Sequence, residues 1–286
     1  MARSNWTRRP EVAAVRRKWP WVSTLIAAIE RFRIHRTGRN SALVAHYGFL
    51  SVFPLMLVFT TILGFVLQDN PELQQRIIDT ALANFPLIGS ELEANPEQLQ
   101  GSIGLLLFGL LTALWAGLKA FNVLQMALDD IDDIPFDARA NAVRVRLQSL
   151  LAIVVIGSAQ IATAVLSGFV SAAGVQWGNR LLLLLGSISI NTLVIAATYR
   201  WLGTLRPTVR QLAPGAIFAG LSFTVLQLVG TTVMTRAIVR ASPIYGTFAT
   251  VIGLLFWLGL HSMIALLGAE MNGVVRLYRK GELSPS

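Results

Sequence analysis

Long apolar runs, separated by short polar connections, dominate the pattern of this chain. A helix rises ~1.5 Å per residue, so roughly 20 apolar residues cross the ~30 Å hydrocarbon core of a bilayer, and each run reaches that length. Helices of a soluble domain carry polar residues every three or four positions on the side that faces water, and these runs do not. We therefore predict an all-α polytopic membrane protein, a bundle of six transmembrane helices over residues 42–67, 103–124, 147–169, 181–202, 213–233 and 247–267.

The segment before the first predicted span, residues 1–41, is basic and has a helical pattern of its own. Its apolar residues recur at helical spacing, and they are Trp21, Val22, Leu25, Ile26, Ile29 and Phe32. This pattern predicts an N-terminal amphipathic helix, which either lies in the cytoplasmic headgroup layer as an interfacial helix or packs under the bundle. The membrane domain then covers residues 42–271, and residues 272–286 form a cytoplasmic tail.

The charge distribution predicts the orientation of the chain in the membrane. Charged residues make up only 14% of the chain and hydrophobic residues 54%, whereas soluble domains have about 25% charged residues. Besides the basic N-terminal segment, the connections on the same side hold Lys119, Arg139, Arg144, Arg146, Arg200, Arg206, Arg210, Arg276, Arg279 and Lys280. The opposite side holds only Arg76, Arg180, Arg236 and Arg240. Cytoplasmic loops carry the excess of Lys and Arg, so both termini are expected in the cytoplasm, and the net charge of +9 needs no nucleic-acid partner.

Polar side chains inside the predicted spans are the candidates for function, because polar groups in a membrane usually face the bundle interior or water. The substrate-path or interior candidates are His46, Ser51, Pro54, Lys119, Asn122, His261, Glu270 and Asn272. Further polar residues within spans are Gln160, Asn191 and Gln227.

Lys119 and Glu270 fall at a similar predicted depth, near the cytoplasmic ends of their helices. A lone lysine and a lone glutamate at one depth are more stable paired than apart, so we expect them to lie close together inside the bundle. In the alternative, Lys119 extends to the headgroups and Glu270 ends its helix in water. Helical spacing puts His261 and Asn272 on one face of the last span and Glu270 on nearly the opposite one.

Pro54 and several small residues predict the local shape of the spans. A proline inside a helix removes a backbone hydrogen bond, so we expect a kink, with Ser51 satisfying the freed carbonyl of Leu50. Small residues four positions apart predict close helix contacts, either within a compact bundle or in a homo-oligomer. These pairs are Ala113 with Gly117, Ala164 with Gly168, and Gly215 with Ala219.

An acidic turn, Asp129 to Asp133, follows the second predicted span. Acidic residues near a helix C-terminus are unfavourable with its dipole and need partners. We expect ion pairs with Arg139, Arg144 and Arg146, and the alternative is a loosely held Mg²⁺ or Ca²⁺. The chain has no cysteine and no nucleotide-binding loop, and we expect neither a cofactor nor a structural metal.

Two runs of the chain carry motifs in register. Residues 40–55 read NSALVAHYGFLSVFPL, and the last span contains YGTFA at 245–249, LFWL at 255–258 and LGAEMN at 267–272. They resemble the "aaaiaFyallSlfPl" and "YGsfg…LlWly…lGAEln" signatures of the YihY/BrkB family, formerly mislabelled ribonuclease BN. The resemblance implies a multi-pass protein of the bacterial plasma (inner) membrane. One run departs from the family, because LDDIDDIP at residues 128–135 stands where an "LNriw.vp" stretch is usual.

Two function classes follow from these residues. The favoured one is a transporter or permease for a small solute or lipid, whose wet central cavity would be lined by His46, Lys119 and Glu270. The alternative is a non-transporting envelope scaffold, in which the interior polar groups only pack. An enzyme is not expected, because metal-dependent RNA cleavage needs clustered carboxylates or histidines, and the three histidines have no metal-ligand spacing.

Overall fold

The computed structural model describes residues 20–66, 103–141, 143–152, 177–245 and 247–282. Every regular element in these ranges is helical, which confirms the all-α prediction. The elements are α2 (Pro20–Ile34), α3 (Thr37–Val66), α6 (Ile103–Ile131), the 3-10 turn η2 (Phe136–Ala138), α8 (Trp177–Trp201), α9 (Val209–Tyr245) and α10 (Thr247–Lys280). Residues 143–152 are also helical.

The long helices cover five of the six predicted spans, and most of the predicted span 147–169 lies outside the described residues. Among the described residues, three stretches are long and apolar enough to cross a membrane, namely Leu107–Ile131, Val209–Gly230 and Val251–Lys280. The count of six spans therefore stays a prediction. Both α9 and α10 extend beyond their predicted spans, at 37 and 34 residues.

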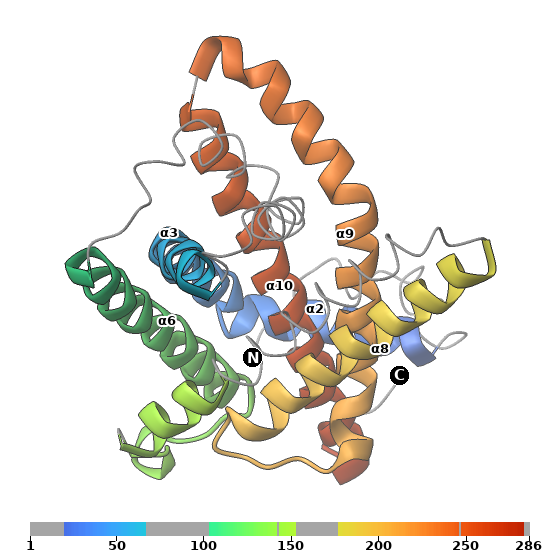
Figure 1. Ribbon diagram of the computed structural model, residues 1–286. Coiled ribbons are helices and arrows are strands. Elements are labelled where there is room, and N and C mark those ends of the chain that lie inside the picture. Colours follow the sequence, from blue (N-terminus) through green and yellow to red (C-terminus); the bar gives the residue numbers. More distant parts are fainter. Residues whose placement is uncertain (1–19, 67–102, 142, 153–176, 246, 283–286) are drawn as a thin grey trace.

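Helix α10 is the central element of the bundle. It packs against α9, α3, α2 and α6, while α3 also packs on α6 and α8 on α9. Figure 1 shows α10 running through the middle, with α3 and α6 on one side and α8 and α9 on the other. Helices α9 and α10 form a hairpin, and α2 packs across α10. The interfacial placement of the N-terminal helix stays a prediction.

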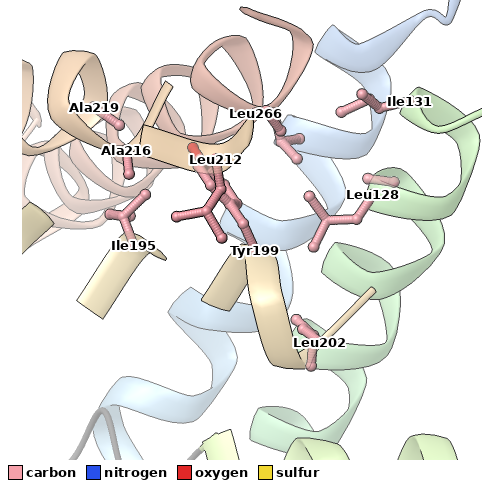
Figure 2. Packing of buried hydrophobic residues seen from close by; sticks show 11 residues of the cluster. Leu128, Ile131, Ile195, Tyr199, Leu202, Leu212, Ala216, Ala219 and Leu266 are labelled. Atoms are coloured by element: carbon pink, nitrogen blue, oxygen red, sulfur yellow. The ribbon is translucent and has the colours of Figure 1, made fainter. Parts of the chain in front are cut away.

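The buried apolar core lies at one end of the bundle, where α6 ends, α8 ends, α9 begins and α10 passes. Its members are Ala127, Leu128, Ile131, Ile195, Tyr199, Leu202, Leu212, Ala216, Ala219, Leu266 and Ala269. Figure 2 shows this cluster gathered where the helices meet. Large apolar side chains elsewhere on α6, α8 and α9 are exposed, including Phe108, Leu111, Leu193 and Leu228, as expected for surfaces that face lipid.

Helix α9 packs on α10 through glycines. A Cβ atom on Gly215 would overlap the carbonyl oxygen of Gly268, and one on Gly268 would lie 2.6 Å from the Gly215 carbonyl oxygen. Ala219, four residues after Gly215, is fully buried against the same contact. The predicted close contact through Gly215 and Ala219 is therefore confirmed, whereas Ala164 and Gly168 lie outside the described residues.

Helix α3 continues through Pro54. The Ser51 hydroxyl donates to the Gly48 carbonyl at 2.7 Å, not to the Leu50 carbonyl that Pro54 leaves without an N–H. The proposed role of Ser51 is therefore wrong, because its hydroxyl reaches back along the preceding turn instead.

Candidate functional site

A polar cluster surrounds Glu270 where α2, α3 and α6 meet α10. We call it the Glu270 cluster, and its members are Arg31, His35, Thr37, Asp133 and Glu270. The Glu270 side chain is fully buried. Its Oε1 atom lies 2.8 Å from His35 Nδ1 and accepts a hydrogen bond from the Thr37 hydroxyl at 2.9 Å. Its Oε2 atom accepts from Arg31 Nε at 3.4 Å, so both carboxylate oxygens have partners.

Arg31 and His35 also connect this buried carboxylate to the surface. The guanidinium of Arg31 donates to the Ile131 carbonyl at 2.8 Å and to Asp133 Oδ2 at 3.1 Å. His35 Nε2 lies 3.5 Å from Asp133 Oδ1. The side chain of Asp133 is 64% exposed, that of His35 12% and that of Glu270 0%, so the cluster runs from solvent to the interior.

The end of α6 presents Asp133 through a Schellman motif. The N–H of Ile134 donates to the Asp129 carbonyl at 2.9 Å, and the N–H of Asp133 donates to the Asp130 carbonyl at 3.2 Å. Asp133 has a φ of 55°, the left-handed conformation that this motif requires after the last helical turn. Pro135 follows, and a proline cannot continue the helix.

The corner between α2 and α3 presents the partners of Glu270. It consists of His35 and Arg36 only, and Arg36 has a φ of 52°. A left-handed conformation is uncommon for arginine, and here it interrupts the helix between α2 and α3. His35 and Thr37 therefore point to the same carboxylate. Thr37 begins α3, and negative charge is favoured near the N-terminus of a helix.

The other acids of the turn after α6 have partners of their own. Asp129 accepts from the backbone N–H of Thr204 at 2.8 Å and from its hydroxyl at 3.0 Å. Asp130 pairs with Arg139 at 2.7 Å, and Asp132 pairs with Arg276 of α10.

The expected ion pair with Arg139 is thus confirmed, whereas those with Arg144 and Arg146 are wrong. Both arginines are exposed, and among the described residues neither forms an ion pair. Helices α2 and α10 supply Arg31 and Arg276 instead, because they pack against the end of α6. The alternative of a bound cation finds no support, since no group of three or more His, Asp or Glu side chains in the described part of the chain is arranged to hold a metal ion.

The opposite face of α10 contacts α9 and α8. Asn272 is buried, and its Oδ1 atom accepts from the backbone N–H of Gly215 at 2.8 Å. His261 lies against Phe223 of α9, with ring centroids 4.9 Å apart. The Tyr199 hydroxyl donates to the Ala265 carbonyl at 2.5 Å. His261 and Asn272 thus face α9 while Glu270 faces α2, as helical spacing predicted.

The expected pairing of Lys119 with Glu270 is wrong. Lys119 is exposed on α6, and among the described residues it forms no ion pair, whereas Glu270 pairs with Arg31 and His35. His46 and Asn122 are also exposed, so His46, Lys119 and Glu270 do not line one cavity. Similar depth was a poor guide because it gives no information about the direction in which each helix points its side chain.

Sequence reasoning missed Arg31, His35 and Asp133 as partners of Glu270. The signal was present in the N-terminal amphipathic pattern, because Arg31 and His35 lie four residues apart and share one helix face. The sequence left open whether this face meets lipid headgroups or the bundle. Only the packing of α2 across α10 turns it toward a buried carboxylate.

Apolar helices long enough to cross a bilayer define this chain as a helical membrane protein. A family model described as "Virulence factor BrkB" matches residues 28–286, so the chain belongs to the BrkB family. This confirms the resemblance in the first and last spans.

Two relatives extend this comparison. Inner membrane protein YhjD of Escherichia coli (strain K12) is 28% identical over 259 residues, which cover 82% of this chain and 76% of the relative. YfkH of Bacillus subtilis (strain 168), named as a ribonuclease-like protein, is 25% identical over 280 residues, which cover 91% of this chain and 97% of the relative. No solved structure matches the chain. The similarity to an inner membrane protein, together with the apolar helices, points to the bacterial inner membrane.

Proposed function

We propose that this chain is a transporter or permease for a small solute or lipid in the bacterial inner membrane. The observation that carries the proposal is the Glu270 cluster, a fully buried carboxylate held by Arg31, His35 and Thr37 at one end of the bundle. Burying ion pairs costs desolvation free energy, and well-packed apolar residues of similar volume often give equal or greater stability. Ionisable groups inside a membrane protein commonly mark substrate or ion pathways.

The position of the cluster supports a gate at this end of the bundle. A single side chain, Arg31 of α2, donates both to Glu270 of α10 and to the carbonyl of Ile131, the last residue of α6. A change at Glu270 would therefore act on three helices at once. A small pocket with a mixed polar and apolar lining lies between α6, α8 and α10, formed by Leu128, Asp132, Tyr199, Pro207, Ala269, Asn272 and Arg276.

The proposal includes the topology expected from the charges, namely six spans with both termini in the cytoplasm. The Glu270 cluster and the pocket then lie near the cytoplasmic surface, and α2 is the cytoplasmic helix that covers this end of α10.

A second candidate is a non-transporting envelope scaffold. The observation that favours it is the full pairing of the Glu270 carboxylate together with the exposure of His46 and Lys119, the other two expected cavity residues. A satisfied buried network can serve only to fix how helices pack. Neither candidate includes RNA cleavage, although YfkH carries a ribonuclease-like name.

Flux from proteoliposomes tests the proposal. Vesicles that contain the purified chain are loaded with a mixed pool of cell metabolites and a fluorescent lipid, and release or inter-leaflet movement is followed. We expect a defined solute or lipid to move, Glu270→Gln to reduce the rate at least about tenfold, and the exposed control Lys119→Gln to leave it unchanged.

Movement no faster than in empty vesicles, with a folded wild-type protein, would reject transport of the species supplied and favour the scaffold. Equal loss of flux in both variants would separate transport from the Glu270 cluster.

A further inference from the structure

Both ring nitrogens of His35 face carboxylate oxygens from different elements. Nδ1 lies 2.8 Å from Oε1 of Glu270 on α10, and Nε2 lies 3.5 Å from Oδ1 of Asp133 after α6. Ionised carboxylates only accept hydrogen bonds. A neutral imidazole has one N–H donor and one lone pair, so it can donate to only one of the two acids, whereas an imidazolium donates toward both.

Charge balance in the cluster favours the imidazolium. Arg31 contributes one positive charge, and Glu270 and Asp133 each contribute a negative one. When His35 is neutral, the charges of the cluster sum to a net negative charge, although one of its carboxylates is fully buried. When His35 is protonated, the charges of the cluster sum to zero. Two further arginines near the end of α6 have acidic partners of their own, since Arg276 pairs with Asp132 and Arg139 pairs with Asp130.

We propose that His35 is a proton-binding site whose imidazolium fastens the α2–α3 corner to α10 and to the end of α6. When the proton leaves, one nitrogen turns its lone pair toward a carboxylate, and the attraction to that acid becomes a repulsion. The proton passes to water on the side of Asp133, whose side chain is 64% exposed, because Glu270 is sealed from solvent.

The backbone of the corner supports two arrangements. Arg36, between His35 and Thr37, has a φ of 52° and is exposed. Such a conformation is unfavourable for a residue with a long side chain and persists when surrounding contacts hold it. His35 and Thr37 are those contacts on either side, so loss of the His35 bridge lets the corner relax away from α10.

Histidine is the side chain whose charge commonly serves as a pH-dependent switch, which makes His35 the group of this cluster to test. The corner is held at low pH and released as the pH rises. That release opens the cytoplasmic end to solute only if the proposed transport function holds. The proton-dependent movement itself does not depend on transport.

Distances between spin labels test the movement directly. The chain has no cysteine, so Arg33→Cys on α2 and Lys280→Cys on α10 give a single labelled pair in proteoliposomes without further changes. Both positions are exposed and lie outside the Glu270 cluster. Pulsed electron resonance between pH 5 and 9 should show one short distance at low pH and a growing longer population at high pH.

Two substitutions and one matched control identify the titrating group. His35→Gln, which removes the ring and cannot take up a proton, should show the longer population at every pH. Asp133→Asn, at an exposed position that folding tolerates, should move the midpoint to lower pH because one attracting charge is lost. His46→Gln replaces an exposed histidine outside the cluster and should keep the wild-type response.

A distance distribution that does not change with pH would overturn the inference, even if flux is observed. The same holds if Asp133→Asn shows the same midpoint pH as the wild-type protein. Conversely, a shift without any flux would uphold the proton site and count against transport, so the two proposals fail separately.

Discussion

The α carbons of Gly215 and Gly268 face each other across the α9–α10 contact so closely that neither position has room for a Cβ atom. The carbonyl oxygen of each glycine occupies the space that the other's methyl group would need. This contact sets the rotation of α10 about its own axis, so that Asn272 faces α9 while Glu270 faces α2.

Replacing Gly215 by alanine should therefore destabilise the protein. The methyl group would push α9 away from the Gly268 carbonyl, and overpacking of this kind costs about 1–3 kcal/mol. The thermal unfolding midpoint in detergent micelles should fall. Gly259→Ala is the matched control, because a Cβ there meets no atom within 4 Å. Equal midpoints for both variants would contradict the close contact.

Asn272→Leu should destabilise the same helix pair for a different reason. The side chain is buried and its amide oxygen accepts from the Gly215 N–H at 2.8 Å. Leucine has a similar volume but leaves that N–H without its acceptor, which costs about 1–3 kcal/mol when the donor stays buried. Asn122→Leu, at an exposed position, serves as the control in urea unfolding. The prediction fails if this control lowers the free energy of unfolding as much as Asn272→Leu does.

Arg31 and Glu270 should show strong energetic coupling. We expect a double-mutant cycle with Arg31→Gln and Glu270→Gln to give about 0.5–3 kcal/mol, because the two groups contact each other and share a network. Each single substitution leaves the other charge with one partner fewer, whereas the double substitution removes both charges.

The same cycle with Lys119→Gln in place of Arg31→Gln should give additive effects. Energetic coupling of Glu270 to Lys119 instead of Arg31 would support the ion pair that was expected from their similar depth. It would also contradict the packing of α2 against α10.

The orientation of the chain can be tested with single cysteines, because the natural sequence contains none. Arg76→Cys should react with a membrane-impermeant maleimide in spheroplasts, in which the inner membrane is intact. Arg144→Cys should react only after permeabilisation. The opposite pattern would place the termini outside, and reaction of both residues before permeabilisation would exclude the six-span arrangement.

Patterns within a single helix were the most reliable guide to structure. The apolar runs predicted the helices, although α9 and α10 continue beyond the predicted spans. The polar part of α10 contacts Arg31 of α2 and Asp132 after α6. Spacing of His261, Glu270 and Asn272 correctly divided the faces of α10, since residues on one helix have a fixed angular relation. The small residue at 215 correctly predicted a close helix contact.

Relations between helices were less accessible. Lys119 and Glu270 share a predicted depth, yet α6 points Lys119 outward while α10 points Glu270 toward α2. The acids after α6 needed cationic partners, as their position at a helix end indicated, but two of those partners came from α2 and α10 rather than from the next residues of the chain.

The sequence by itself determined that this is an all-helical membrane protein of the BrkB family, because the lengths of apolar runs and local motifs depend only on neighbouring residues. Only the tertiary structure decided that Arg31 and His35 hold Glu270. That pairing depends on the rotation and crossing of α2, α3 and α10, which packing at contacts such as Gly215 with Gly268 sets and which no single segment encodes.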